Sequence, residues 1–301
     1  MRDLASCLSD HAAQVSDTSC SSYRSINPCL SAAFAPSIQN SVTCLYRSIL
    51  PSHNQTAMTL TWSRTASSHA LAISFDDDPS TNFKITTSSR LFRKSKGCKS
   101  LQLRSSSKID LFWDLSTARY HPGPEPRDGF YLAVVVDSEL GLILGDKAHQ
   151  FKTGAGEGKF ALVSRQEHFS GSTVYSTRAK FCEGGGAHDI SIRCGSGGGE
   201  SEGAKHPVLW VCIDKKTVMK ERKLQWNFRG NQTIFLDGLL VDLLWDVHDW
   251  FYNPDSGCAV FMFKTRSGLD SSRLWMHDDE AMPHHHHRHL DFSFMICACK
   301  N

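Results

Sequence analysis

The chain has 301 residues, 40% of them hydrophobic, which is enough to bury a large core as one domain or as two smaller ones. Its formal net charge of +2 favours no class of charged partner, and no apolar run approaches the roughly 20 residues of a membrane-spanning helix. The eleven cysteines are an odd number, and the N-terminus lacks the apolar segment of a secretory signal. We therefore expect free thiols and an intracellular protein, cytoplasmic or nuclear, that is not secreted.

Residues 1–40 are rich in serine and poor in large apolar side chains. Such a composition cannot bury enough apolar surface to offset the entropy of ordering, so we predict a disordered N-terminal arm. Serine richness is also typical of organelle transit peptides. Those peptides are poor in acidic residues, however, and the arm contains Asp3, Asp10 and Asp17. Organelle targeting is therefore the less favoured interpretation.

Short apolar stretches alternate with turn residues through the rest of the chain, which is typical of antiparallel strands. Residues 41–152 contain expected strands at Cys44–Arg47, His69–Phe75, Ser100–Leu103, Ile109–Leu115 and Phe130–Val136. Residues 160–268 repeat these pieces in the same order, at Ala161–Arg165, His188–Cys194, Thr233–Leu236, Val241–Val247 and Cys258–Phe263. Repetition in order predicts two related units of about seven or eight strands each.

The two copies share one seven-residue stretch, Ile109–Leu115 and Val241–Val247, on which the prediction of duplication mainly depends. In both copies every second residue is aliphatic or tryptophan, and the alternate positions carry one hydrophobe between two aspartates. Successive side chains of a strand point to opposite faces, so each strand has one wholly apolar face. We predict that Trp113 and Trp245 are core residues in equivalent strands.

The predicted fold is therefore all-β, with two tandem related antiparallel β units, sandwich-like or barrel-like, and a disordered N-terminal arm. The units occupy residues 41–152 and 160–268. A polar, histidine-rich linker at 269–290 and a C-terminal strand at 291–301 follow them. The pattern leaves open whether the two units share one β domain.

Motifs that point to a known family occur in order along the chain, at Met1–Cys7, Pro36–Cys44, Ser89–Arg93, Gly123–Pro126, Asp128–Tyr131, Leu224–Thr233 and Trp245–Trp250. They resemble a plant-specific family catalogued only as a domain of unknown function, number eight-sixty-eight. The resemblance covers roughly residues 36–300 and implies a plant origin, with no established activity and no catalytic residues. The chain departs from the family pattern before Lys300, where we expect a tryptophan.

Four aspartates, Asp110, Asp114, Asp242 and Asp246, are candidates for acid–base chemistry. Within each strand the two carboxylates lie four residues apart, which is about 13 Å along an extended chain. Two carboxylates that act on one bond need a separation of roughly 5–9.5 Å. A catalytic pair within one strand is therefore excluded, although pairs from different sheets could meet. We interpret the four as solvated or turn-capping residues.

The second copy differs from the first in having His248, Asp249 and Trp250 directly after its Trp-Asp strand. A histidine beside an aspartate is typical of a general base or of a metal ligand. Adjacent residues of a strand point apart, however, so a hydrogen-bonding role at the strand end is the favoured interpretation. The candidate site consists of His248, Asp249, Asp246 and Asp114.

No segment has the spacing of a metal or cofactor site. The run His284–His287 with His289 has a metal-binding composition, but we interpret it as a polar linker. Cys297 and Cys299 alternate onto one face of the last strand without a second cysteine pair, so we predict two small buried hydrophobes. The loop Gly154–Lys159 lacks the spacing of a phosphate-binding loop. We therefore predict no cofactor and no bound metal.

Two clusters of basic residues are candidate surfaces for anionic lipid or nucleic acid. The alternative, which we favour, is a solvated strand edge on which lysines prevent aggregation. The first cluster is Arg90, Arg93, Lys94, Lys96, Lys99 and Arg104, and the second is Lys215, Lys216, Lys220, Arg222, Lys223 and Arg229.

Three classes of function remain open from the sequence. A non-catalytic binding module with a small apolar or lipid-like ligand between β layers is favoured, because closed eight-stranded sheets leave room for one small ligand. A protein-interaction adaptor would use the serine-rich arm and the long loops to dock a protein partner. An uncharacterised enzyme would act through the region of His248 and Asp249.

Overall fold

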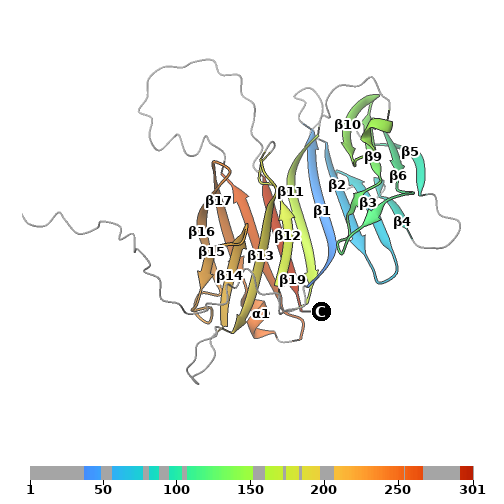
Figure 1. The fold of residues 1–301 in the computed structure, drawn as a ribbon. Coiled ribbons are helices and arrows are strands. Elements are labelled where there is room, and N and C mark those ends of the chain that lie inside the picture. Colours follow the sequence, from blue (N-terminus) through green and yellow to red (C-terminus); the bar gives the residue numbers. More distant parts are fainter. Residues whose placement is uncertain are drawn as a thin grey trace, which may run out of the picture.

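The computed structural model describes residues 37–48, 56–76, 81–87, 95–103, 107–151, 160–171, 174–182, 185–196, 207–253, 255–266 and 292–300. These residues form four β-sheets and one short α-helix, and a 3-10 turn lies at Ala148–Gln150. Figure 1 shows the arrangement of the sheets. The all-β class is therefore confirmed. The predicted arm up to residue 36, the loop Gly154–Lys159 and the linker at 269–290 lie outside the described residues.

The largest sheet has nine strands and draws them from both predicted units. Its strands in spatial order are β16 (Arg229–Leu236), β17 (Leu239–Asp246), β18 (Cys258–Thr265), β19 (Ser293–Cys299), β11 (Phe160–Ser170), β1 (Ile38–Ser48), β2 (Ala57–Arg64), β3 (His69–Phe75) and β4 (Phe83–Thr87). All neighbours are antiparallel except β11 and β19, which run parallel. The pairing of β1 with β11 therefore joins the two units in one sheet.

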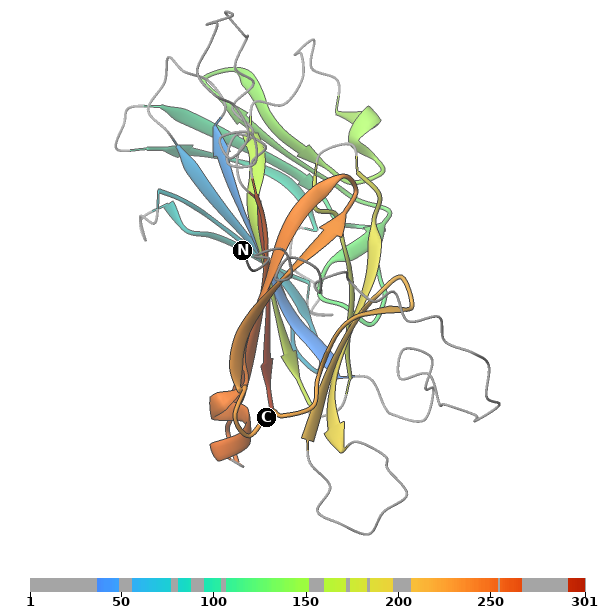
Figure 2. The ribbon, with the colours of Figure 1, turned by 90° about the vertical axis from the view of Figure 1, so that its left-hand side faces the viewer.

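Two smaller sheets have four strands each. The first contains β10 (Glu139–Leu144), β9 (Tyr131–Val136), β6 (Lys108–Asp114) and β5 (Lys96–Gln102), and the second contains β12 (Val174–Ala179), β13 (His188–Ser196), β14 (Pro207–Ile213) and β15 (Lys216–Glu221). A short ribbon pairs β7 (Arg119–Tyr120) with β8 (Pro126–Asp128). Helix α1 (His248–Tyr252) follows β17 and lies beside the end of β19 (Figure 2). Among the described residues, no helix is long and apolar enough to cross a membrane.

Each four-stranded sheet packs on its own part of the nine-stranded sheet and encloses a separate hydrophobic core. Both small sheets lie on the same face of the large sheet. Arg165 of β11 contacts the Sγ atom of Cys44, which belongs to the first core, and Phe169, four residues further along β11, belongs to the second core. The opposite face of the large sheet, here called the open face, carries the less buried residues of each strand, such as Met262 and Leu244.

The alternation predicted for the two Trp-Asp strands is present in β6 and β17, and Trp113 and Trp245 are buried in the two cores. Each tryptophan lies directly opposite a glycine of the neighbouring strand, Gly97 on β5 or Gly230 on β16. A Cβ atom on these glycines would come within 2.9 Å and 2.3 Å of the respective rings, so the rings require glycine there. The pairing of a tryptophan with a glycine on the neighbouring strand occurs in both units and supports the internal duplication, which stays a proposal.

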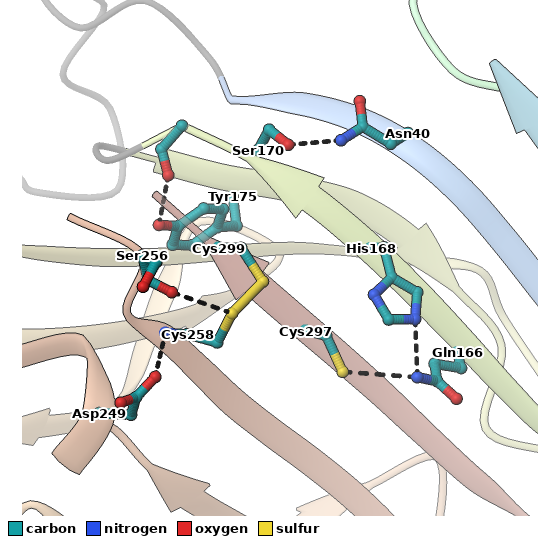
Figure 3. Close-up of a disulfide and its surroundings, with 11 residues drawn as sticks. Asn40, Gln166, His168, Ser170, Tyr175, Asp249, Ser256, Cys258, Cys297 and Cys299 are labelled. Carbon is teal, nitrogen blue, oxygen red and sulfur yellow. Dashed lines mark hydrogen bonds between the residues drawn. A yellow bond between two sulfur atoms is a disulfide. The ribbon is translucent and has the colours of Figure 1, made fainter. Parts of the chain in front are cut away.

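The expectation of free thiols is wrong for three of the described cysteines, because Cys212, Cys258 and Cys299 are disulfide-bonded. Cys258 and Cys299 face each other across β18 and β19 with a Cα–Cα distance of 4.2 Å, and they form a disulfide (Figure 3). Cys297 is a half-buried free thiol, so neither it nor Cys299 is the small buried hydrophobe we predicted. Their alternation places them on the open face, whereas Phe294 and Ile296 face the core. The cysteines therefore do not identify a cellular compartment.

Candidate functional site

The end of β17 turns into α1 through Asp246, one of the four candidate site residues. Its Oδ1 atom accepts the backbone N–H of His248 at 3.0 Å, and its Oδ2 atom accepts the Nε–H of Arg229 at 2.7 Å. Burial raises the pKa of the Asp246 carboxyl, but these two contacts prevail and hold it below its usual value. The first turn of α1 is thereby fixed against the first residue of β16.

His248 and Asp249 lie in α1 rather than at the strand end that the sequence pattern indicated. The imidazole of His248 packs against the rings of Phe228 and Tyr252, with centroid distances of 4.9 and 4.7 Å. The Oδ2 atom of Asp249 accepts the N–H of Cys258 at 2.9 Å. Histidine and aspartate therefore have different partners and do not form an acid–base pair. The hydrogen-bonding role that we predicted is carried by the Asp249 side chain.

Exposed aromatic side chains collect at this end of the second unit. Trp226 is 76% exposed and lies two residues before Phe228 in the chain. Tyr252 is 61% exposed, and its ring contacts the half-buried ring of Phe228. The guanidinium of Arg229 lies 5.5 Å from the Phe228 ring centroid. We call Trp226, Phe228, Arg229, His248 and Tyr252 the aromatic corner.

Two motifs that are distant in the sequence meet at the aromatic corner. Leu224–Thr233 supplies the loop and strand on one side, and Trp245–Trp250 supplies the end of β17 and most of α1 on the other. The pairing of β16 with β17 brings them together, and the Nε1–H of Trp245 donates to the carbonyl of Asn227 at 3.1 Å. The position of the corner is therefore fixed by sheet pairing and by a buried tryptophan.

Asp114, the fourth candidate, lies on β6 in the first unit and is not part of the aromatic corner. Its Oδ1 atom accepts the N–H and the hydroxyl of Ser116 at 3.0 and 2.6 Å, and its Oδ2 atom pairs with Lys96 at 3.0 Å. Burial raises the pKa of this carboxyl, but the contacts to Ser116 and Lys96 prevail and lower it to about 2. Like Asp246, it caps the turn after its strand and pairs with a cation on the neighbouring strand.

The remaining two aspartates also bond to residues directly opposite them. Asp110 accepts a hydrogen bond from the hydroxyl of Ser100, and Asp242 accepts one from Thr233 at 2.7 Å. Asp242 also pairs with Arg266 at 2.7 Å. Each of the four carboxylates therefore bonds to partners within its own unit. Their roles are to cap turns or to pair with residues across a hairpin.

A cluster of ionic side chains between the two cores was not predicted from the sequence. It consists of Arg165, Glu167 and Glu125, and we call it the ionic seam. Arg165 Nε donates to Glu167 Oε1 at 2.7 Å, and its two Nη atoms donate to the two oxygens of Glu125 at 3.0 and 2.6 Å. Glu167 is fully buried, and Gln39 Nε2 donates to its other oxygen at 2.7 Å. Burial raises the pKa of Glu167, and the guanidinium of Arg165 opposes that rise.

A second cluster joins two hairpin turns of the second unit. His188 lies at the start of β13, where Nδ1 contacts Asp214 at 2.6 Å and Nε2 contacts Asp237 at 2.9 Å. Both aspartates have positive φ and belong to the tight turns β14–β15 and β16–β17. Burial lowers the pKa of His188, but the two carboxylates prevail and raise it above its ordinary value of 6.5.

We expect this arrangement to make the stability of the second unit depend on pH. A histidine whose pKa is raised by folding contributes its full stabilisation below pH 6.5, and the contribution is lost as the pH rises through the raised pKa. The temperature of the thermal midpoint should therefore decrease as the pH is raised from 6 to 9. The His188→Gln variant should not show this decrease. Differential scanning calorimetry checks this, with the exposed His149→Gln as the control. Equal pH profiles for wild type and His188→Gln would contradict it.

Several described residues of the two basic clusters have partners of their own or lie apart along the chain. In the first, Lys96 pairs with Asp114 and Lys99 lies 5.0 Å from the ring centroid of Phe83, while Arg90, Arg93, Lys94 and Arg104 lie outside the described residues. In the second, β15 separates the cations at its start from those after its end. The interpretation as solvated strand edges stays the favoured one.

Among the described residues, no group of three histidine, cysteine or acidic side chains could hold a metal ion, and the histidine run at 284–289 lies outside them.

No curated protein and no solved structure matches the chain. The model of one family matches residues 37–300, which is most of the sequence. The motifs that meet at the aromatic corner lie within this match. The chain therefore belongs to the family described as "Plant protein of unknown function (DUF868)".

Proposed function

We propose that this protein is a non-catalytic binding module that docks a protein partner at the aromatic corner. The observation that carries the proposal is the exposure of Tyr252, at 61%, within a preformed cluster of rings, together with that of Trp226, at 76%, two residues before Phe228 of that cluster. Tryptophan, tyrosine and arginine are the residue types that dominate the energetics of protein–protein interfaces. Single exposed rings are common on surfaces, but a cluster of them with an arginine is a docking feature.

Three rings of the corner, those of Phe228, His248 and Tyr252, are packed against one another before any partner binds. Trp250, the buried residue of α1, anchors the helix in the second core, and Asp246 fixes its first turn. Side chains that are ordered in advance lose less entropy on association, so more of the contact energy appears as affinity.

The charges around the corner indicate the chemistry of the partner. Arg222 and Lys223 are exposed just before Trp226, and neither forms an ion pair within the part of the chain that the structure describes. A partner segment with an apolar anchor for the rings and carboxylates for these cations complements this surface. The proposed partner is therefore a protein with an acidic and apolar docking segment.

The small apolar ligand predicted between the β layers has less support. Rings of the protein itself occupy the centre of the second core, where Phe181 contacts Phe263 and Phe294 at centroid distances of 5.8 and 6.4 Å. In the first core, Trp62 contacts Phe130 at 6.0 Å. Interiors are close-packed, so a ligand there would have to displace these side chains. A small molecule that co-purifies with the protein and is detected by native mass spectrometry would favour the ligand hypothesis instead.

Substitution of the exposed rings tests the docking proposal. The partner is first captured from plant extract by cross-linking to the wild-type protein, then purified, and its Kd is measured by calorimetry. Trp226→Ala should weaken binding by about 2 kcal/mol, roughly thirtyfold in Kd, with Tyr252→Ala acting in the same direction.

The matched control is Phe235→Ala, because this phenylalanine is 74% exposed and lies at the other end of β16. It should bind like wild type, and all three variants should keep the wild-type thermal midpoint because the side chains are exposed. Wild-type affinity in both Trp226→Ala and Tyr252→Ala would show that the corner is not the docking site.

A further inference from the structure

We propose that the Cys258–Cys299 disulfide is a thiol–disulfide exchange site, at which a dithiol reductant opens the bond and loosens the aromatic corner. The effect on partner binding rests on the function proposed above, whereas the exchange reaction does not. Three observations carry the inference: the position of the disulfide, the contacts of its neighbours, and the small part of the sheet that depends on it.

Figure 3 shows the disulfide between β18 and β19. Cys258 and Cys299 alternate with the core-facing residues of these strands, so the disulfide lies on the open face of the nine-stranded sheet, outside both hydrophobic cores. Cys258 and Cys299 are half-buried, while the next residues along each strand, Ala259 and Ala298, face the second core and are 2% and 0% exposed. Exchange requires that a thiolate reach one sulfur of the disulfide, so access limits the rate. The open face provides that access, which a disulfide inside a core would lack.

On the β18 side, the disulfide adjoins the hydrogen bonds that end α1. The N–H of Cys258 donates to Asp249 Oδ2 at 2.9 Å, and the N–H of Gly257 donates to the carbonyl of Asn253 at 3.0 Å. Gly257 packs so closely that a Cβ atom would lie 2.3 Å from the carbonyl oxygen of Asp249. Close packing transmits small displacements, so a shift of Cys258 moves the end of α1.

On the β19 side, Lys300 follows Cys299 and contacts the same region. Its N–H donates to the carbonyl of Gly257 at 3.2 Å, and its ammonium lies 5.1 Å from the ring centroid of Trp250. The same ammonium donates to the carbonyl of Asn253 at 3.4 Å. The disulfide therefore ties the end of β19 to α1, which carries two residues of the aromatic corner.

The reaction balances with a dithiol as the second reactant. One thiolate of the reductant attacks a sulfur of the disulfide, the bond between Cys258 and Cys299 breaks, and the departing cysteine thiolate takes up a proton. The second thiolate of the reductant then attacks the mixed disulfide and releases the other cysteine as a thiol. The reductant ends as its own disulfide, having given two electrons and two protons.

Reduction is expected to act locally. β18 and β19 pair at seven positions, and the cysteines form the last pair. The core-facing residues of the other pairs, such as Phe261 and Phe263, stay buried without the disulfide. The two strands should therefore remain in register while their end and α1 open more often.

Hydrogen exchange of the full chain, with dithiothreitol as the reductant, tests the inference. After reduction, the amides of Asn253, Gly257, Cys258 and Lys300 should exchange about tenfold faster, while amides of β2 keep their rate. At the amides around α1, the double variant Cys258→Ser/Cys299→Ser should behave like the reduced protein whether or not dithiothreitol is present, which separates this bond from the disulfide of Cys212. Cys297→Ser, which changes the free thiol on the same face, should respond to dithiothreitol like wild type.

Two results would overturn the inference. One is alkylation of Cys258 and Cys299 in protein purified without reductant, which would show that the bond does not form. The other is unchanged exchange around α1 after mass spectrometry confirms complete reduction. If reduction speeds this exchange but neither Trp226→Ala nor Tyr252→Ala alters partner binding, the proposed function fails and the exchange site stands. If the ring substitutions weaken partner binding but reduction leaves the exchange around α1 unchanged, the docking function stands and the exchange site fails.

Discussion

Replacing Trp245 with alanine is expected to lower the free energy of unfolding by about 3–5 kcal/mol. The indole is 9% exposed, lies over Gly230 and packs in the second core. Alanine would leave a cavity, because β16 has no side chain at Gly230 to fill it. It would also remove the donor that satisfies the carbonyl of Asn227. Urea unfolding followed by circular dichroism measures the change.

The same experiment compares the two units. Trp113 is 6% exposed and lies over Gly97, so Trp113→Ala should cost a similar amount if the two units are copies of one design. Phe235→Ala serves as the control for loss of an exposed aromatic ring and should leave the midpoint unchanged. A Trp245→Ala midpoint equal to that of wild type would contradict the assignment of this residue to the core.

The sequence allowed the faces of the strands to be predicted because side-chain direction in a strand has a period of two residues. In β6 and β17 the apolar set, including Leu111 and Leu243, is buried, as the alternation indicated. His69–Phe75 was predicted with the bounds that β3 has. Each of these inferences uses only neighbouring residues.

Pairing between distant strands could not be predicted in this way. Alternation indicates which face of a strand is apolar, but it does not indicate which strand lies beside it. The sheet joins Cys44 of β1 to Arg165 of β11, and it joins β11 in parallel to β19 across a long stretch of sequence. For the same reason the disulfide was missed, since Cys258 and Cys299 become opposite residues only through the register of β18 and β19.

Only the local contacts of the candidate residues could be predicted from the sequence. Asp114 and Asp246 have the turn-capping role expected of them, because their partners lie within two residues along the chain or directly across the hairpin. The surface at the corner was not predicted. His248 gains its ring contacts from α1 and from Phe228, twenty residues away in the sequence. The polar sequence around Glu167 did not indicate burial, because the residues that pair with this segment are distant in the sequence. Glu167 accepts a hydrogen bond from β1, and its neighbour Arg165 pairs with the loop before β8.

Replacing Arg165 with methionine is expected to lower the free energy of unfolding by about 3–5 kcal/mol, because it leaves a buried carboxylate without its cation. Glu167 is fully buried, and the guanidinium of Arg165 is 2.7 Å from its Oε1 atom. Glu125, which is 32% exposed, can be hydrated when its partner is lost and should contribute less to the change. Urea unfolding at pH 7 measures the total.

The pH dependence of the stability lost in Arg165→Met distinguishes two causes: the unpaired charge of Glu167 and the lost packing of the Arg165 side chain. Burial raises the pKa of Glu167, and removing Arg165 also removes the interaction that opposes this rise. A carboxyl whose pKa is raised by folding binds its proton more readily in the folded state, so stability increases as the pH falls. The deficit of Arg165→Met should therefore be larger at pH 8 than at pH 5, and Arg165→Met/Glu167→Leu should recover much of it. A deficit that is equal at both pH values and persists in the double variant would mean that packing of the Arg165 side chain, rather than neutralisation of Glu167, joins the two cores.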